Sequence, residues 1–292
     1  MITVGHGTVP GVEVVANGVR QWVERFGNDR GPAVLLVSGA DAPCGRWTPA
    51  YVEPLVQADF QVIRYDLRDV GRSQLMGHDE PYRLDDLAAD AVGVLDELDI
   101  DRAHVIGRSM GGMIGQLLAL DRGERVRSLT LVGTTPGLGD DRLSPAADAV
   151  VDALAERLFQ PPPTDEGARV AWMVDGYRIF NGPGFAFDEV AQRAAAEVEV
   201  ATAWRPETGH GVAVAASPSR LDRLGEIKAP TLVVHGDADG VFPIDHAEAL
   251  HRGIADSELW VVEGLGHELP DDFAPAFTAR VLAFLASSSE SG

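Results

Sequence analysis

The sequence has a single cysteine, few basic residues and no long apolar run. Cys44 alone cannot form an internal disulfide, so the fold does not require an oxidising compartment. Lys and Arg total 24 against 45 Asp and Glu, giving a net charge of −21 that argues against binding to nucleic acid or to an anionic membrane. No uncharged apolar stretch approaches the roughly 20 residues of a transmembrane helix, and the first residues do not resemble a signal peptide. We therefore expect a cytoplasmic protein.

The sequence also lacks a cluster of metal-ligating residues and a dinucleotide-binding fingerprint, so we expect neither a metal nor a cofactor. What is present is typical of a globular enzyme-sized chain. Its 292 residues, 45% of them hydrophobic and 24% charged, are enough for one large α/β domain with a substantial core. The expected partner is a small molecule.

Hydrophobic periodicity predicts a hairpin followed by a parallel sheet. Residues 12–15 and 21–26 alternate between apolar and polar, and Asn17-Gly18 between them is a preferred hairpin turn. Later apolar runs alternate little, which is typical of parallel strands buried on both faces. These runs are 33–37, 61–65, 103–106, 129–132 and 231–234.

Helical segments such as 84–98 separate the buried strands, and this alternation predicts a doubly wound, mostly parallel α/β sheet. The pattern lapses over 137–217, where three helix-like segments occur without a convincing buried strand. We interpret this stretch as a helical lid insertion, the alternative being three ordinary covering helices. The predicted core is 1–136 and 218–286, and 287–292 is predicted to be a flexible tail.

Gly107-Arg108-Ser109-Met110-Gly111 follows a buried strand and precedes an apolar helix. A sharp strand-to-helix turn of this kind exposes a serine hydroxyl at the positive N-terminus of the helix, and the flanking glycines relieve the crowding. A serine that only capped the helix would require neither glycine. Ser109 is therefore the predicted nucleophile.

A serine hydroxyl needs a base to accept its proton and a third group to orient that base. In sheets of this type the partners follow in the order serine, acid, histidine. His267 lies in a glycine-rich loop after the last predicted strand, although a solvated loop histidine would look the same. Asp239 follows the 231–234 strand and is the predicted acid, with Asp237 as the alternative.

The oxyanion hole requires two backbone donors. We predict the N–H of Met110, directly after the nucleophile, and the N–H of Ala40, in the small-residue loop after 33–37. The insertion offers apolar and aromatic candidates for the substrate pocket, which ordinary lid packing would equally explain: Trp172, Met173, Tyr177, Phe180 and Trp204.

At these residues the chain resembles the α/β-hydrolase family over nearly its whole length, with further similarity at 65–73, 229–236 and 264–267. The segment 66–73 resembles a structural turn of the family, which we interpret as scaffold. Within the family, 63–66, 89–92 and 103–107 are similar to aclacinomycin methylesterase-like carboxylesterases. The resemblance implies a small-molecule esterase acting on a bulky natural product, for example on its methyl ester.

Two positions depart from the family pattern. Ser38 stands where many relatives have histidine before the oxyanion glycine. Arg108 precedes the nucleophile, where an apolar residue or histidine is commoner. Arg108 would bind a substrate carboxylate, orient a loop or, as we favour, form a salt bridge with one of the many acids.

The predicted function is cleavage of a carboxylic ester through an acyl-enzyme intermediate. The same triad would also serve a lactonase, a C–C bond hydrolase or a cofactor-free perhydrolase. A non-catalytic small-molecule receptor is a further alternative, which the completeness of the triad disfavours. Chemistry with an aspartate nucleophile is disfavoured because residue 109 is serine.

Overall fold

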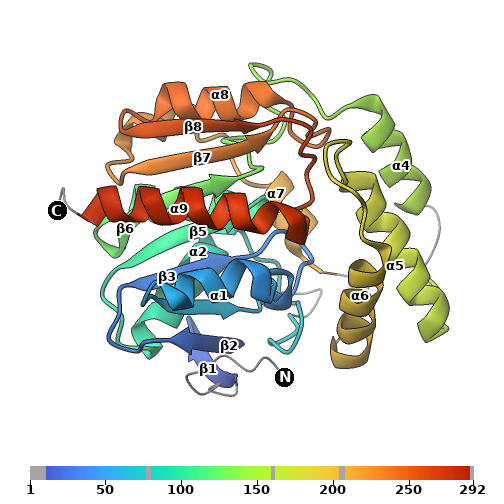
Figure 1. The fold of residues 1–292 in the computed structure, drawn as a ribbon, viewed down its shortest axis with the longest axis horizontal. Helices are drawn as coiled ribbons and strands as arrows, with labels where there is room; N and C mark the ends of the chain where they lie inside the picture. Colours follow the sequence, from blue (N-terminus) through green and yellow to red (C-terminus); the bar gives the residue numbers. More distant parts are fainter. Residues whose placement is uncertain (1–10, 77–79, 159–161, 204–207, 290–292) are drawn as a thin grey trace.

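The computed structural model describes residues 11–76, 80–158, 162–203 and 208–289, which build a sheet with helices on both faces (Figure 1). Its strand order is β1-β2-β4-β3-β5-β6-β7-β8. The strands are β1 (Val12–Ala16), β2 (Val19–Gly27), β3 (Ala33–Val37), β4 (Gln61–Tyr65), β5 (Ala103–Arg108), β6 (Val126–Val132), β7 (Thr231–Gly236) and β8 (Ser257–Val262). The α-helices are α1 (Pro49–Gln57), α2 (Leu84–Glu97), α3 (Met110–Asp121), α4 (Asp148–Leu158), α5 (Glu166–Phe180), α6 (Glu189–Ala203), α7 (His210–Ala215), α8 (Ile244–Gly253) and α9 (Ala274–Ser289).

The N-terminal hairpin and the parallel core are both confirmed. Asn17 (φ 49°) and Gly18 (φ 76°) form the β1–β2 turn, and two positive φ angles are what the right-handed strand twist requires of a two-residue loop. β2 also pairs antiparallel with β4, whereas β4, β3, β5, β6, β7 and β8 run parallel. The sheet is therefore mixed at its N-terminal edge and parallel where the candidate nucleophile is attached.

Each central strand contributes to a hydrophobic core on both faces of the sheet, which explains the continuous apolar runs. Leu35 faces the core beneath α2, α3 and α8, whereas its neighbours Val34 and Leu36 face the core beneath α1 and α9. All three side chains are almost completely buried. Because side chains alternate along a strand, helices on both faces bury every position, and apolar residues occupy most of them.

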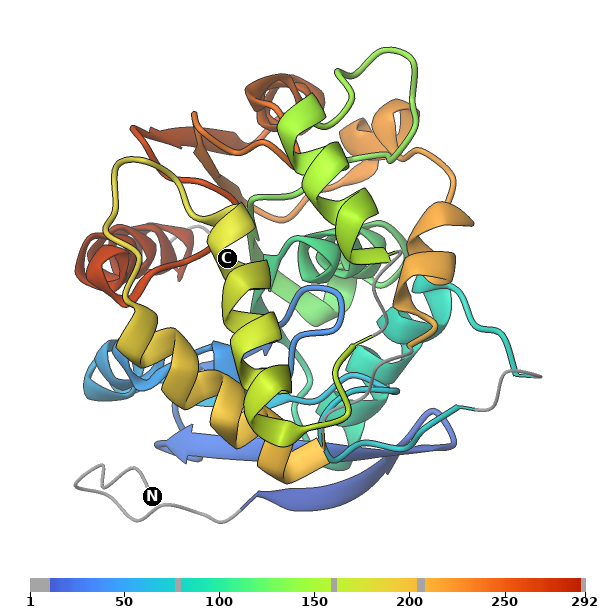
Figure 2. The same ribbon diagram turned by 90° about the vertical axis from the view of Figure 1, so that its right-hand side faces the viewer.

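The helical insertion between β6 and β7 comprises α4, α5, α6 and α7, one helix more than the three predicted segments. Its helices lie beside the carboxyl ends of the parallel strands (Figures 1 and 2). α5 and α6 share a small core that includes Val170, Val174 and Ala196. At the other end of the core, α9 continues to Ser289, three residues into the segment predicted as a tail.

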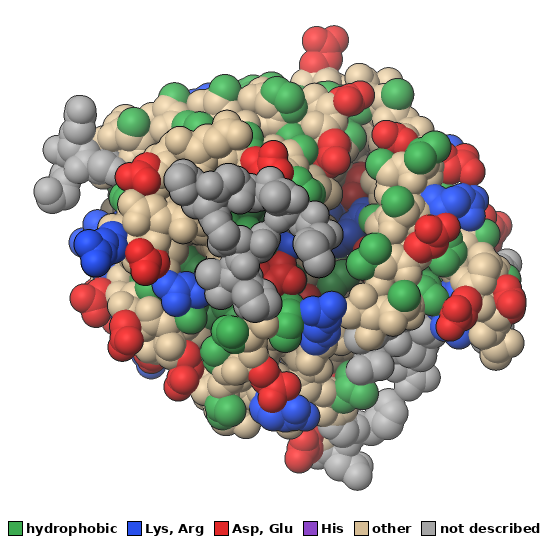
Figure 3. Space-filling model, turned by 60° about the horizontal axis from the view of Figure 1, so that its bottom comes forward, with side chains coloured by type: hydrophobic (Ala, Val, Ile, Leu, Met, Phe, Trp, Pro, Cys, Tyr) green, Lys and Arg blue, Asp and Glu red, His purple; other side chains and the backbone are tan. Residues whose placement is uncertain are grey.

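Acidic and basic side chains are interspersed on the face seen in Figure 3. Many arginines are paired with carboxylates, as Arg142 is with both Asp140 and Asp222. Among the helices of the described residues, none is long and apolar enough to cross a bilayer.

The turn after β4 anchors the 3₁₀ segment η1 (Cys44–Arg46). Asp66 accepts hydrogen bonds from the backbone N–H of Cys44 (2.7 Å) and of Arg72 (2.9 Å). The Ser73 hydroxyl donates to the Asp66 carbonyl at 2.6 Å. These bonds are structural, as expected of a scaffold turn, and they fix the start of the segment that carries Arg46.

Candidate active site

Ser109 occupies a strained turn between β5 and α3. Its backbone angles, φ 53° and ψ −121°, lie in a region that residues other than glycine rarely adopt. The chain packs so closely here that a Cβ on Gly107 would lie 2.2 Å from the Gly111 carbonyl, and one on Gly111 would lie 2.2 Å from the Val37 carbonyl. The two glycines of the motif are therefore required sterically, because only they allow the turn to close.

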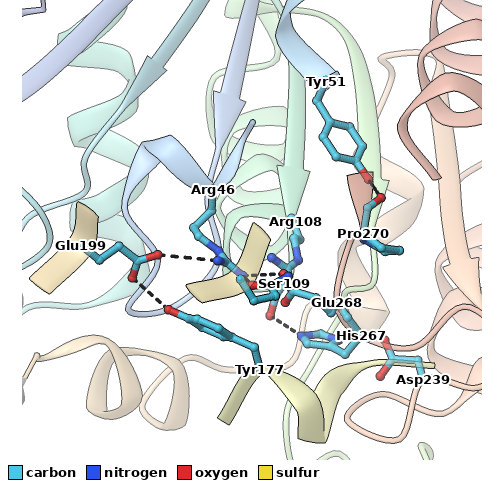
Figure 4. A network of polar contacts seen from close by, with 11 residues as sticks. Arg46, Tyr51, Arg108, Ser109, Tyr177, Glu199, Asp239, His267, Glu268 and Pro270 are labelled. Atoms are coloured by element: carbon cyan, nitrogen blue, oxygen red, sulfur yellow. Dashed lines mark hydrogen bonds and ion pairs between the residues drawn. The ribbon is translucent and has the colours of Figure 1, made fainter. Parts of the chain in front are cut away.

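Ser109, His267 and Asp239 are brought together from three separate loops (Figure 4). His267 Nε2 lies 3.1 Å from Ser109 Oγ, and His267 Nδ1 lies 2.8 Å from Asp239 Oδ2. This geometry makes Nδ1 the donor to the carboxylate and leaves Nε2 free to accept the serine proton. The arrangement can therefore generate a serine nucleophile.

Asp239, rather than Asp237, carries the bond to His267. Its other oxygen, Oδ1, accepts the backbone N–H groups of Val241 (2.8 Å) and Phe242 (3.0 Å). Burial raises the pKa of Asp239, but the charge and hydrogen bond of His267 outweigh burial and hold the pKa below its ordinary value. Asp237 is exposed and accepts the N–H of Gly264, so it shapes the turn instead.

Aromatic rings hold the imidazole of His267 in place. The ring of Phe242 packs edge-on at 5.4 Å between centroids, and Phe180 from α5 lies at 5.9 Å. The His267 side chain is only 9% exposed. Its surroundings therefore exclude most water while leaving the Ser109 contact intact.

Two backbone segments next to Ser109, the start of α3 and the loop after β3, carry the predicted oxyanion donors Met110 and Ala40. Met110 is the first residue of α3, and the first N–H groups of a helix have no partner within it. Gly39 approaches so closely that a Cβ there would be 3.3 Å from Ser109 Cβ. Ala40 follows Gly39, and its N–H forms no hydrogen bond within the described residues. Ser38 reaches only the Pro43 carbonyl, at 3.5 Å.

A chain of buried charges extends from the nucleophile strand to the insertion (Figure 4). Arg108 donates to Glu268 Oε2 (2.7 Å) and to the His267 carbonyl (3.0 Å), so the predicted salt bridge is present and also holds the histidine loop. Glu268 Oε1 accepts from Arg46 at 2.6 Å. Arg46 lies 3.7 Å from Glu199 of α6 and 4.1 Å from the ring centre of Tyr177 of α5.

The carboxylates of this network differ in their tendency to ionise. Burial raises the pKa of Glu268, but Arg108 and Arg46 outweigh burial and bring its pKa below the ordinary value. Burial also raises the pKa of Glu199, and there it prevails over Arg46. Beside this network is a cavity of about 10 Å³ lined by residues that include Gly39, Arg46 and Arg108, which is room for about one water molecule.

The pocket candidates of the insertion have different positions. Phe180 contacts the His267 ring, and Tyr177 stacks on Arg46 and donates to Glu199 at 3.0 Å. Trp172 and Met173 pack in the small core between α5 and α6, which Tyr177 also contacts. Trp204 lies outside the described residues. No group of three or more metal-ligating side chains is assembled in the described part of the chain.

Sequence reasoning missed Glu268, Arg46 and Glu199. A signal existed for Glu268, because an arginine at the end of a buried strand needs a carboxylate and Glu268 directly follows the predicted base. Nothing in the local sequence points to Arg46 or Glu199, since their contact depends on how the insertion packs on the core.

Comparison with known proteins agrees with this geometry. Residues 32–274 match the model of the alpha/beta hydrolase fold, so the chain belongs to the α/β-hydrolase family. It is a hydrolase of that family, and the predicted resemblance is confirmed.

Relatives with different activities are similarly close. The rhodomycin D methylesterase DnrP of Streptomyces peucetius is 34% identical, over 86% of this chain and 90% of its own. A putative carbamate hydrolase of Variovorax paradoxus is 34% identical (92% and 97%), and the 2-hydroxy-6-oxo-6-phenylhexa-2,4-dienoate hydrolase of Burkholderia cepacia is 31% identical (88% and 89%). An esterase structure from Exiguobacterium antarcticum superposes with a TM-score of 0.78 at 26% identity, over 95% of this chain and all of that one.

Proposed function

We propose that this protein is a serine esterase that hydrolyses a carboxylic ester of a small molecule, with the methyl ester of a bulky natural product as its substrate. The observation that carries the proposal is the hydrogen-bonded series Ser109–His267–Asp239 at a strained turn. The similarity to two rhodomycin D methylesterases, at 34% and 33% identity, supports the substrate class.

The reaction proceeds in two steps. Ser109 Oγ attacks the ester carbonyl while His267 Nε2 accepts its proton, and the N–H groups of Met110 and Ala40 stabilise the negative oxygen. His267 then gives the proton to the leaving alkoxide, which departs as the alcohol. Water, deprotonated by the same imidazole, cleaves the acyl-enzyme to release the acid and regenerate Ser109.

The insertion acts as a lid over this site in our proposal, with 1–136 and 218–286 as the core. In this proposal the lid helices move to admit a substrate, because the cavity beside the charge network has room for only about one water molecule. Phe180 and Tyr177, on the face of α5 that meets the site, are the proposed contacts with a bulky substrate.

Labelling with a fluorophosphonate and hydrolysis of a nitrophenyl ester test the proposal. The wild type should be labelled once and turn over, and Ser109→Ala should lose roughly 10⁶-fold in kcat, the cost of removing the serine of such a triad. Ser144→Ala, at an exposed loop serine, is the matched control and should behave as wild type. A wild type that neither labels nor turns over would exclude the esterase.

C–C bond hydrolysis is the second candidate, because dienoate hydrolases are nearly as similar as the methylesterases. Comparison of kcat/KM for methyl esters of polycyclic acids with that for a 2-hydroxy-6-oxo dienoate separates the two. A kcat/KM for the dienoate more than tenfold higher than that for the methyl esters would identify the protein as a C–C bond hydrolase instead.

A further inference from the structure

His210 reaches from the first residue of α7, within the insertion, to the loop that follows β3. Its side chain is completely buried, and its Nδ1 accepts the backbone N–H of Asp41 at 3.0 Å. Its Nε2 lies 3.0 Å from the carbonyl oxygen of Arg68, which only accepts hydrogen bonds. With these two partners Nδ1 is the acceptor and Nε2 the donor, and the Asp41 carboxylate oxygen Oδ1 lies 3.4 Å from Nδ1.

The bond from His210 fixes the loop that supplies an oxyanion donor. Asp41 has a φ of 61°, and the N–H of Ala42 bonds the Gly39 carbonyl at 3.4 Å, so residues 39–42 form a tight turn beside Ser109. The imidazole holds the peptide between Ala40 and Asp41, while the turn bond holds the opposite side of Ala40. Together these bonds set the direction of the Ala40 N–H.

Packing and hydrogen bonds around His210 fix the position of its imidazole. The Tyr82 ring packs edge-on against the imidazole at 6.2 Å. The N–H of Gly209, directly before His210, bonds Asp69 at 3.0 Å, and the Tyr82 hydroxyl bonds the same carboxylate at 2.7 Å. Thr208 also donates to the Asp41 side chain. The segment is therefore attached to the core at several points around the turn.

We propose that His210 is a positioning residue that sets the oxyanion hole from within the insertion. The inference rests on the proposed function, in which the Ala40 N–H stabilises the negative oxygen. Loss of the Nδ1 acceptor would therefore weaken transition-state binding without weakening substrate binding.

Two variants divide the roles of the imidazole. In His210→Asn the amide oxygen corresponds to Nδ1 and keeps the acceptor for Asp41, whereas in His210→Gln the amide nitrogen corresponds to Nε2 and keeps only the donor to Arg68. We expect His210→Gln to lose about 10–100-fold in kcat with KM unchanged, because misplacing a catalytic donor by about 1 Å costs up to 10²-fold. His210→Asn should stay close to wild type.

A second readout isolates the oxyanion. Ser109 Oγ attacks the carbonyl carbon of a trifluoromethyl ketone, and its proton passes to His267. The carbonyl oxygen then becomes an alkoxide that the N–H groups of Met110 and Ala40 would bind. His210→Gln should weaken its binding by the same factor as kcat/KM. His251→Gln, the same substitution at an exposed histidine of α8, is the matched control and should leave both measurements unchanged.

Equal losses in the asparagine and glutamine variants, or none in either, would overturn the inference, since a purely structural histidine does not distinguish Nδ1 from Nε2. If the variants fail to fold, a ¹⁵N–¹H correlation spectrum of the wild type with ¹⁵N-labelled histidine tests the inference instead. A proton on Nδ1 of His210 would contradict the hydrogen bond from the Asp41 N–H and overturn the inference. A wild type without ester turnover would reject the proposed function. An active wild type with indistinguishable variants would reject this inference alone.

Discussion

Replacing Glu268 by glutamine removes one buried negative charge from between two arginines while preserving the shape of the side chain. Glu268 is 5% exposed and bonds Arg108 and Arg46 at 2.7 and 2.6 Å. Breaking a buried ion pair from one side costs about 3–5 kcal/mol, because the remaining charge stays out of water without a partner. For a chain of 292 residues that loss lowers the melting temperature by about 5–8 °C.

The effect has a defined pH dependence. The pKa of Glu268 in the folded protein lies below its ordinary value of 4.5, so its ionised form stabilises the fold. That stabilisation is complete above about pH 4.5 and is lost as the pH falls through the lower, folded pKa. The difference between wild type and Glu268→Gln should therefore be constant near neutral pH and shrink in acid.

Thermal unfolding followed by circular dichroism at pH 7 and from pH 5 to pH 3 measures both quantities. Glu263→Gln, at an exposed carboxylate of the same loop, is the matched control and should unfold with the wild type. A Glu268→Gln variant that melts within about 1 °C of wild type at pH 7 would refute the reasoning, because leaving a buried charge without its partner should destabilise the fold by several kcal/mol.

Four further outcomes are expected. Gly111→Ala should fail to form an active protein, because its Cβ would lie 2.2 Å from the Val37 carbonyl; esterase-like activity and labelling of a folded variant would contradict this. Asp239→Asn should lower kcat about 10⁴-fold by favouring the wrong imidazole tautomer. Asp237→Asn should have little effect on kcat, and the reverse order in steady-state assays would reassign the acid. Cys44 is buried and burial raises its pKa, so Ellman's reagent should label it only after unfolding, and rapid labelling of the native protein would disprove its burial.

The local features of the sequence determined much of the fold and the centre of the site. β3 and β4 occupy the residues of their predicted runs, because a strand covered on both faces buries every side chain; β3 is wholly apolar, and β4 is apolar or aromatic except at Gln61 and Arg64. Asn17-Gly18 and the glycines around Ser109 were equally readable, since positive φ and close packing restrict the residues that can stand there.

Tertiary structure buries Asp239, the acid predicted from its place on the loop, against His267 and leaves the alternative Asp237 exposed. It also brings Glu268 into contact with Arg46, 222 positions earlier in the chain, and His210 into contact with the turn at Asp41, 169 positions earlier. These contacts depend on how the insertion packs on the carboxyl edge of the sheet. Periodicity and motif spacing describe neighbours along one element, and they carry no information on which distant side chains that packing brings together.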